Sequence, residues 1–98
     1  MNTFTKKSSE QYPIVWEFKG LLPPGTTLSS GVASAIKVAD NSDQTSAVLA
    51  SPNAIIAGTQ ATVTVKGGVN GVIYKLTMLV SLAPAGTLSD DILMTVGD

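Results

Sequence analysis

Short runs in which apolar and polar residues alternate extend along most of the chain. Residues 61–66 place Ala61, Val63 and Val65 on one side and polar residues on the other, which predicts a strand with one buried face. Residues 12–18 alternate in the same way. They predict a first strand whose inward side chains are Tyr12, Ile14, Trp16 and Phe18.

Other segments carry weaker or different strand signals. Residues 72–80 are apolar on both sides, which predicts a central strand. The last strand is expected to bury Ile92, Met94 and Val96. Less regular patterns predict four further strands, near residues 26–29, 32–38, 46–50 and 54–57. Of these, 32–38 is also compatible with a helical turn, because small residues occupy both of its faces.

Turn-forming residues recur about every 8–12 positions, and no segment keeps the period of a stable helix. The count of about seven strands is the number expected of an immunoglobulin-like sandwich. The sequence therefore predicts an all-β fold, an immunoglobulin-like β-sandwich of about seven antiparallel strands. Its two layers are expected to pack through Tyr12, Trp16, Val63, Tyr74 and Met78.

Residues 1–10 are mostly polar and are expected to form a flexible N-terminal arm, with Phe4 as its single anchor. Residues 11–98 would then be the folded domain. The arm is a candidate for contact with a partner protein, since disordered segments often become ordered on binding. Its candidate contact residues are Phe4, Lys6 and Lys7.

Composition narrows the classes of function. The 98 residues are 44% hydrophobic and only 13% charged, so some apolar surface is expected to meet another chain. A net charge of −1 disfavours nucleic acid as a partner, and no apolar stretch is long enough to span a membrane. The N-terminus lacks the apolar core of a secretory signal. Without cysteine, the chain is expected to fold unaided in a reducing cytoplasm.

The sequence has neither histidine nor cysteine. Serine–histidine and cysteine–histidine nucleophile pairs are therefore excluded, as are the usual zinc sites. Asp90 and Asp91 form the most evident carboxylate pair, but neighbours along a strand point to opposite faces. We therefore expect no catalytic residue, no metal ligand and no cofactor, and interpret the chain as a non-enzymatic protein.

Three local motifs admit both a binding and a structural interpretation. The Asp40–Asp43 loop is rich in oxygen ligands that could bind calcium, but a turn closed by its own side chains is favoured. Residues 67–71 could hold a phosphate, yet a hairpin-type connection explains their glycines better. Trp16 with Tyr12 could stack on a sugar, although a core position is favoured for Trp16.

The C-terminal half resembles small immunoglobulin-like virion proteins of tailed bacteriophages. In these proteins an alternating Val/Thr strand leads into a Gly-Gly-x-x-Gly-x-x-Tyr turn, a Tyr-x-Leu-Thr strand, a glycine turn and a last strand ending in Val. The matching positions here are Gly67, Gly68, Gly71, Tyr74, Leu76, Thr77, Gly86 and Val96. The N-terminal half agrees in outline at Lys6, Lys7, Trp16, Ser29 and Ser30. Tyr74 also resembles the tyrosine corner of Greek-key sandwiches, in which the phenol binds a nearby backbone group.

The resemblance implies a structural component of a tailed phage particle, located in the virion and made in the host cytoplasm. The first expectation is a capsid decoration or cement protein that binds the major capsid protein and is oligomeric in the assembled particle. The alternatives are a head-completion or tail-associated protein, or an adhesion or glycan-binding module. Fold alone does not choose between these roles.

Overall fold

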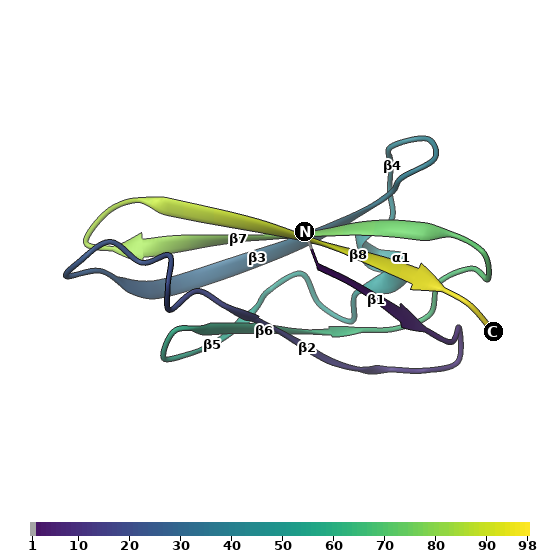
Figure 1. The fold of residues 1–98 in the computed structure, drawn as a ribbon, viewed down its shortest axis with the longest axis horizontal. Coiled ribbons are helices and arrows are strands. Elements are labelled where there is room, and N and C mark those ends of the chain that lie inside the picture. The colour runs from purple at the N-terminus through teal and green to yellow at the C-terminus, as the bar shows by residue number, and fades with distance from the viewer. Residues whose placement is uncertain (1) are drawn as a thin grey trace.

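The computed structural model describes residues 2–98, which form two β-sheets with one short helical turn (Figure 1). The larger sheet has the strand order β1-β8-β7-β3-β4 and the smaller has β2-β6-β5. The bounds are β1 Asn2–Lys6, β2 Tyr12–Glu17, β3 Thr27–Lys37, β4 Ser42–Asp43, α1 Thr45–Val48, β5 Ile55–Ala57, β6 Gln60–Val65, β7 Ile73–Ala83 and β8 Thr87–Val96. Within residues 2–98, no helix has the length and apolar character needed to cross a membrane.

Strand β7 lies at the centre of the larger sheet, between β3 and β8, as its two apolar faces predict. Its alternate residues Tyr74, Leu76, Met78 and Val80 are buried. In the smaller sheet, β2 and β6 pair antiparallel, with Trp16 opposite Ala61. The strands expected over 12–18 and 61–66 are thus confirmed, and their predicted inward residues Trp16, Phe18, Val63 and Val65 are buried.

The core lies between the two layers and draws side chains from both sheets. Of the five residues predicted to join the layers, Trp16, Val63, Tyr74 and Met78 are buried, and Tyr12 packs partly buried against them. The last strand also buries Met94 and Val96, as predicted, and Ile92 packs partly buried against the core.

Strand β3 differs from its prediction because the two segments expected near 26–29 and 32–38 form one continuous strand. A register shift between Leu28 and Ser30 lets both halves pair with β7. Its buried face carries Ala33 and Ala35, whereas Val32 is 52% exposed. In this half of β3 the alanines therefore face the core, and Val32 faces solvent.

Residues 46–50, expected to be a strand, instead include most of helical turn α1. Asp43 initiates this turn, since its carboxylate accepts hydrogen bonds from the backbone N–H and the hydroxyl of Thr45 at 3.0 and 2.7 Å. The carbonyl of Gln44 then accepts the N–H of Val48 at 3.1 Å. Because Val48 and Leu49 are both buried, the apolar pattern is satisfied by a turn as well as by a strand.

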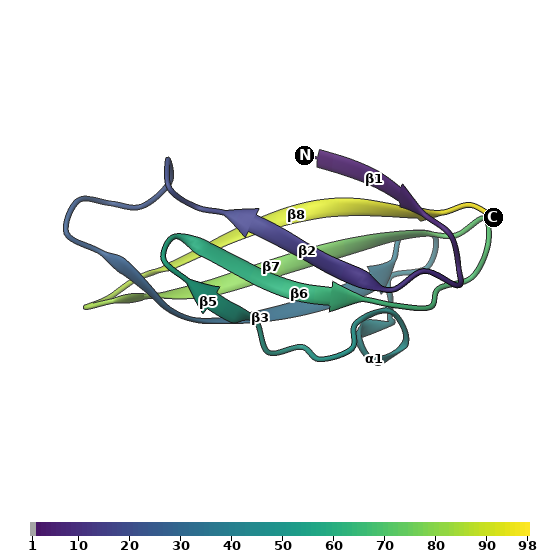
Figure 2. The ribbon, with the colours of Figure 1, turned by 90° about the horizontal axis from the view of Figure 1, so that it is seen from below.

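Two further predictions, for the glycine-rich segment and for the N-terminal segment, differ from the structure. The glycine-rich segment 67–71 does not close a hairpin, because β6 and β7 belong to different sheets. Residues 2–6, expected to lie in an arm outside the domain, form β1, which pairs with β8 in parallel. The prediction of an all-antiparallel fold therefore fails at this pair. Figure 2 shows β1 running beside β8 toward the C-terminus.

Candidate functional site at the junction of the termini

Three segments that are distant in the sequence meet at one end of the molecule. They are residues 6–8 at the end of β1, the loop 67–71 and the C-terminal residues 96–98, which we call the terminal junction. The backbone N–H of Gly97 donates to the Lys6 carbonyl at 2.9 Å, and that of Gly71 donates to the Val96 carbonyl at 2.8 Å. The junction therefore contains two of the three predicted contact residues, Lys6 and Lys7.

Lys6 is the buried cation of the terminal junction, with 1% of its surface exposed. Its ammonium group donates to the carbonyl oxygens of Gly67 at 2.6 Å and Lys7 at 2.7 Å. Burial lowers the pKa of Lys6 below its usual value, and the negative charges of Glu10 and Asp98 oppose this shift. Lys6 thus acts as a bridge from β1 to the loop 67–71.

Asp98 ties the C-terminus to both other segments. Its carboxylate accepts hydrogen bonds from the Ser8 backbone N–H at 2.7 Å and from the Ser8 hydroxyl at 2.8 Å. These bonds lower the pKa of Asp98, and the charges of Lys6 and Lys7 add to the effect. The backbone N–H of Asp98 donates to the Asn70 side chain at 3.0 Å.

The glycine loop has the shape that the Gly-Gly-x-x-Gly-x-x-Tyr motif requires. Gly68 takes a φ of +96°, and a Cβ at this position would lie 2.7 Å from Cγ2 of the buried Val96. The phenol oxygen of Tyr74 accepts the backbone N–H of Val69 at 3.0 Å. The predicted closure of Tyr74 onto a nearby backbone group is confirmed, and it holds the loop against the end of β8.

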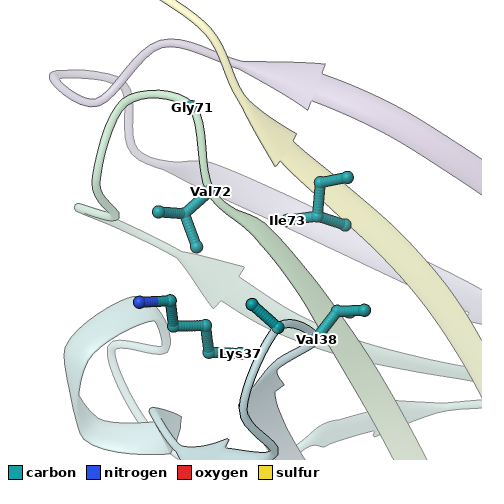
Figure 3. A pocket seen from close by; sticks show the side chains of 6 residues that line it. Lys37, Val38, Gly71, Val72 and Ile73 are labelled. Atoms are coloured by element: carbon teal, nitrogen blue, oxygen red, sulfur yellow. The ribbon is translucent and has the colours of Figure 1, made fainter.

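A hollow of about 250 Å³ lies beside the junction, where the end of β3 approaches the start of β7 (Figure 3). Val38, Val72 and Ile73 contribute apolar side chains to its lining, and Lys37 contributes an amine. Val38 and Ile73 are 45% and 43% exposed, and Val69 in the adjacent loop is 63% exposed. This end of the molecule therefore presents apolar side chains to solvent, a feature that the sequence patterns do not predict.

The three predicted contact residues have different environments. Lys7 is exposed, and its backbone N–H donates to the Glu10 carboxylate at 2.7 Å. Phe4 is half-buried against the core, with its ring centroid 6.3 Å from that of Tyr12. Lys6 is buried. Contact of these residues with a partner stays a prediction, and in this arrangement the Lys7 side chain is the most accessible.

The remaining candidate groups take part in local structure. Asp40 accepts the Ser42 backbone N–H at 2.9 Å, so the Asp40–Asp43 segment contains the expected side-chain-closed turn. Asp91 accepts the Thr77 hydroxyl at 2.7 Å. Across residues 2–98, no group of three or more acidic side chains has the arrangement of a metal site. Trp16 is 3% exposed, which removes it from the sugar-stacking platform.

Comparison with known protein families decides between the remaining alternatives. A family model described as podophage GP4 fiber-tail adaptor protein gp77 matches residues 6–95. The chain belongs to this family. No curated protein matches the sequence.

Membership of the fiber-tail adaptor family makes the chain a structural component of a phage virion, in a family of structural adaptors and not of enzymes. It also assigns the chain to the tail of the virion. The expected capsid decoration role and its expected partner, the major capsid protein, are not supported, whereas the tail-associated alternative is. The error has a physical reason: the motifs that carry the resemblance specify the glycine loop and the Tyr74 closure, and these say nothing of which virion surface the domain meets.

Proposed function

We propose that the chain joins a tail fibre to the tail of a podophage virion. The observation that carries this proposal is the family match over residues 6–95, which takes in the whole smaller sheet and most of the larger one. The match therefore covers nearly all of the fold, except most of β1, and is not limited to a single motif. Its partners would be a fibre protein and a tail protein of the same particle.

The shape of the domain supports a bridging role. Its principal extents are 43, 24 and 21 Å, so its two ends are well separated. The loop after β2 lies at one end and carries Leu21, which is 55% exposed. The loop before β7 lies at the other end and carries Val69, which is 63% exposed. Exposed aliphatic side chains at both ends are suited to docking two different proteins.

The finer assignment to an immunoglobulin-like sandwich is also a proposal. The smaller sheet, β2-β6-β5, follows the order of strands B, E and D in immunoglobulin domains, and β3-β7-β8 follows C, F and G. The Tyr74 closure at the start of β7 supports the same assignment, because the tyrosine corner lies near the start of strand F. The position of β1 beside β8 departs from the constant-type order.

The N-terminal segment is proposed to contribute to partner contact through Lys7, whose side chain reaches solvent. Lys6 would become accessible, and Phe4 fully accessible, only if β1 left β8. Lys7→Gln should then weaken attachment to the virion while lowering the free energy of unfolding by less than about 0.5 kcal/mol, because this exposed side chain acts on Asp98 only through its charge. An unchanged amount of this variant in purified particles would contradict a role for Lys7.

The proposed function is tested by preventing synthesis of the chain during phage infection. We expect particles with normal DNA-filled heads that lack tail fibres, as measured by electron microscopy and by mass spectrometry of purified virions. Supplying the chain in trans should restore the fibres. Particles that keep their fibres but lose head integrity would refute the adaptor role. Synthesis in the host cytoplasm stays a prediction that fractionation of infected cells can test.

A further inference from the structure

The outer face of the larger sheet is rich in aliphatic side chains that remain exposed among residues 2–98. Four of its residues are between 43% and 52% exposed, namely Val32, Val38, Ile73 and Leu79. Val32 lies on β3, Val38 directly follows β3, and Ile73 and Leu79 lie on β7. All four are on the side of the sheet opposite the buried Ala33, Ala35, Met78 and Tyr74. We call this surface the outer face.

Strand register arranges the outer face in rows that run across the strands. One row contains Val32, Leu79 and Ser89, and the next contains Ser34, Thr77 and Asp91. The third row contains Ile36, Lys75 and Leu93. The fourth contains Ile73 and Thr95, together with Val38, whose N–H donates to the Ile73 carbonyl at 3.0 Å.

This order of rows is symmetric about its centre. The two outer rows carry aliphatic residues on β7 and on or directly after β3. Of the two inner rows, one carries the negative charge of Asp91 and the other carries the positive charge of Lys75. A two-fold axis in the plane of the face, perpendicular to the strands and between the inner rows, would exchange the rows. Leu79 of one copy would then face Ile73 of the other, and Val32 would face Val38.

The charges also become complementary in this arrangement. Asp91 of the second copy would lie in the row of Lys75, one strand away, which is within reach of a lysine side chain. Within each copy the Thr77 hydroxyl donates to Asp91 at 2.7 Å and orients the carboxylate. Each copy would thus supply one cation and one anion, giving two equivalent ion pairs in the dimer.

The size of the face is sufficient for a weak specific interface. Strands β3, β7 and β8 extend across all four rows, and β1 extends across two of them. At about 4.8 Å between strands and about 6.7 Å between rows, the face covers roughly 450 Å² per copy. The total of about 900 Å² is in the range of weak, transient interfaces. Dissociation constants in about the micromolar range are typical of small interfaces, and neighbouring positions in a virion would raise the effective concentration.

We propose that the outer face is a self-association surface on which a second copy of the chain packs, related by the two-fold axis described above. This inference rests on the register and exposure of the face and does not depend on the adaptor role. A tail fibre or tail protein would still bind elsewhere, at the exposed loops of the two ends.

Sedimentation velocity of the purified full chain tests the proposal over about 10 µM to 1 mM, a range that includes micromolar dissociation constants. We expect the mass to rise from the 10.0 kDa of one chain toward twice that value. Leu79→Ser should raise the dissociation constant by about tenfold or more, because the symmetric dimer loses the contact twice. Val15→Ser is the matched control, since Val15 is also 49% exposed but lies on the smaller sheet.

Charge reversal gives an independent test. Lys75→Glu alone should weaken the dimer, since two carboxylates would then lie near each other across the interface. Adding Asp91→Lys should restore association toward that of the native chain. A mass of 10.0 kDa at every concentration would overturn the proposal, as would equal effects of Leu79→Ser and Val15→Ser. Circular dichroism of each variant verifies that the sheets remain folded.

Discussion

Gly68 offers the sharpest test of how the terminal junction is built. Its φ of +96° belongs to a region that costs an L-residue about 1–2 kcal/mol. A Cβ would also lie 2.7 Å from Cγ2 of Val96, which is fully buried. Forcing an extra group into packed structure costs about 1–3 kcal/mol. Gly68→Ala should therefore lower the free energy of unfolding by about 2–5 kcal/mol.

Gly71→Ala is the matched control, because Gly71 lies in the same loop with a φ of +85°, but no described residue other than its two chain neighbours has an atom within 4 Å of its Cβ position. It should cost only the backbone component of about 1–2 kcal/mol. Urea denaturation followed by the fluorescence of Trp16, the single tryptophan, measures both variants. Gly68→Ala should also lower the Tm by at least about 8 °C. Equal losses in the two variants would refute the packing of Gly68 against Val96.

Three further predictions concern single side chains. Tyr74→Phe should cost about 0.5–1.5 kcal/mol in urea denaturation, because the N–H of Val69 loses its 3.0 Å acceptor; an unchanged stability would contradict this bond. Trp16→Phe should change the free energy of unfolding by less than about 1 kcal/mol, because the buried Nε1 has no hydrogen-bond partner among the described residues. Trp16→Ala should cost about 3–5 kcal/mol. Thermal melts followed by circular dichroism compare the two variants, and equal losses would refute the reasoning. Hydrogen bonds from Ser8 lower the folded-state pKa of Asp98 below its usual value of 3.8. The stability that this carboxylate contributes is therefore present above pH 3.8 and is lost as the pH falls through the lowered pKa. Asp98→Asn should consequently lose less stability than the native chain between about pH 5 and pH 2, and equal acid sensitivity would show that Ser8 and Asp98 are not coupled.

The parts of the fold that follow from sequence are those in which a local pattern allows one solution. Alternation over 61–66 and 12–18 correctly predicts β6 and β2, because a strand that buries one face imposes a period of two. The doubly apolar segment 72–80 correctly predicts the central position of β7. In each case the pattern of apolar and polar side chains within the strand is enough to predict the strand and its buried faces.

The parts that are missed depend on contacts between distant segments. Residues 67–71 have the same glycine pattern whether they close a hairpin or cross between sheets, and the choice is made by pairing of β6 with β2 and of β7 with β3. Residues 46–50 bury Val48 equally well in a turn or in a strand. Local periodicity cannot separate such alternatives.

The β1 part of the terminal junction could have been predicted from the sequence. Thr3 and Thr5 alternate with the inward Phe4 and Lys6, a short strand pattern that the high polarity of residues 1–10 conceals. The burial of Lys6 could not have been predicted, since its acceptor, the Gly67 carbonyl, lies 61 positions away. The same limit applies to function, because the turn motifs indicate a virion protein but not its place in the particle.

Cryo-electron microscopy of the intact virion tests the central claim most directly. The two-sheet domain, with its 43 Å long axis and its five-stranded and three-stranded layers, should fit density between the tail and the base of a fibre. Density for this domain on the outer surface of the head, with none where the fibres attach, would contradict the adaptor role.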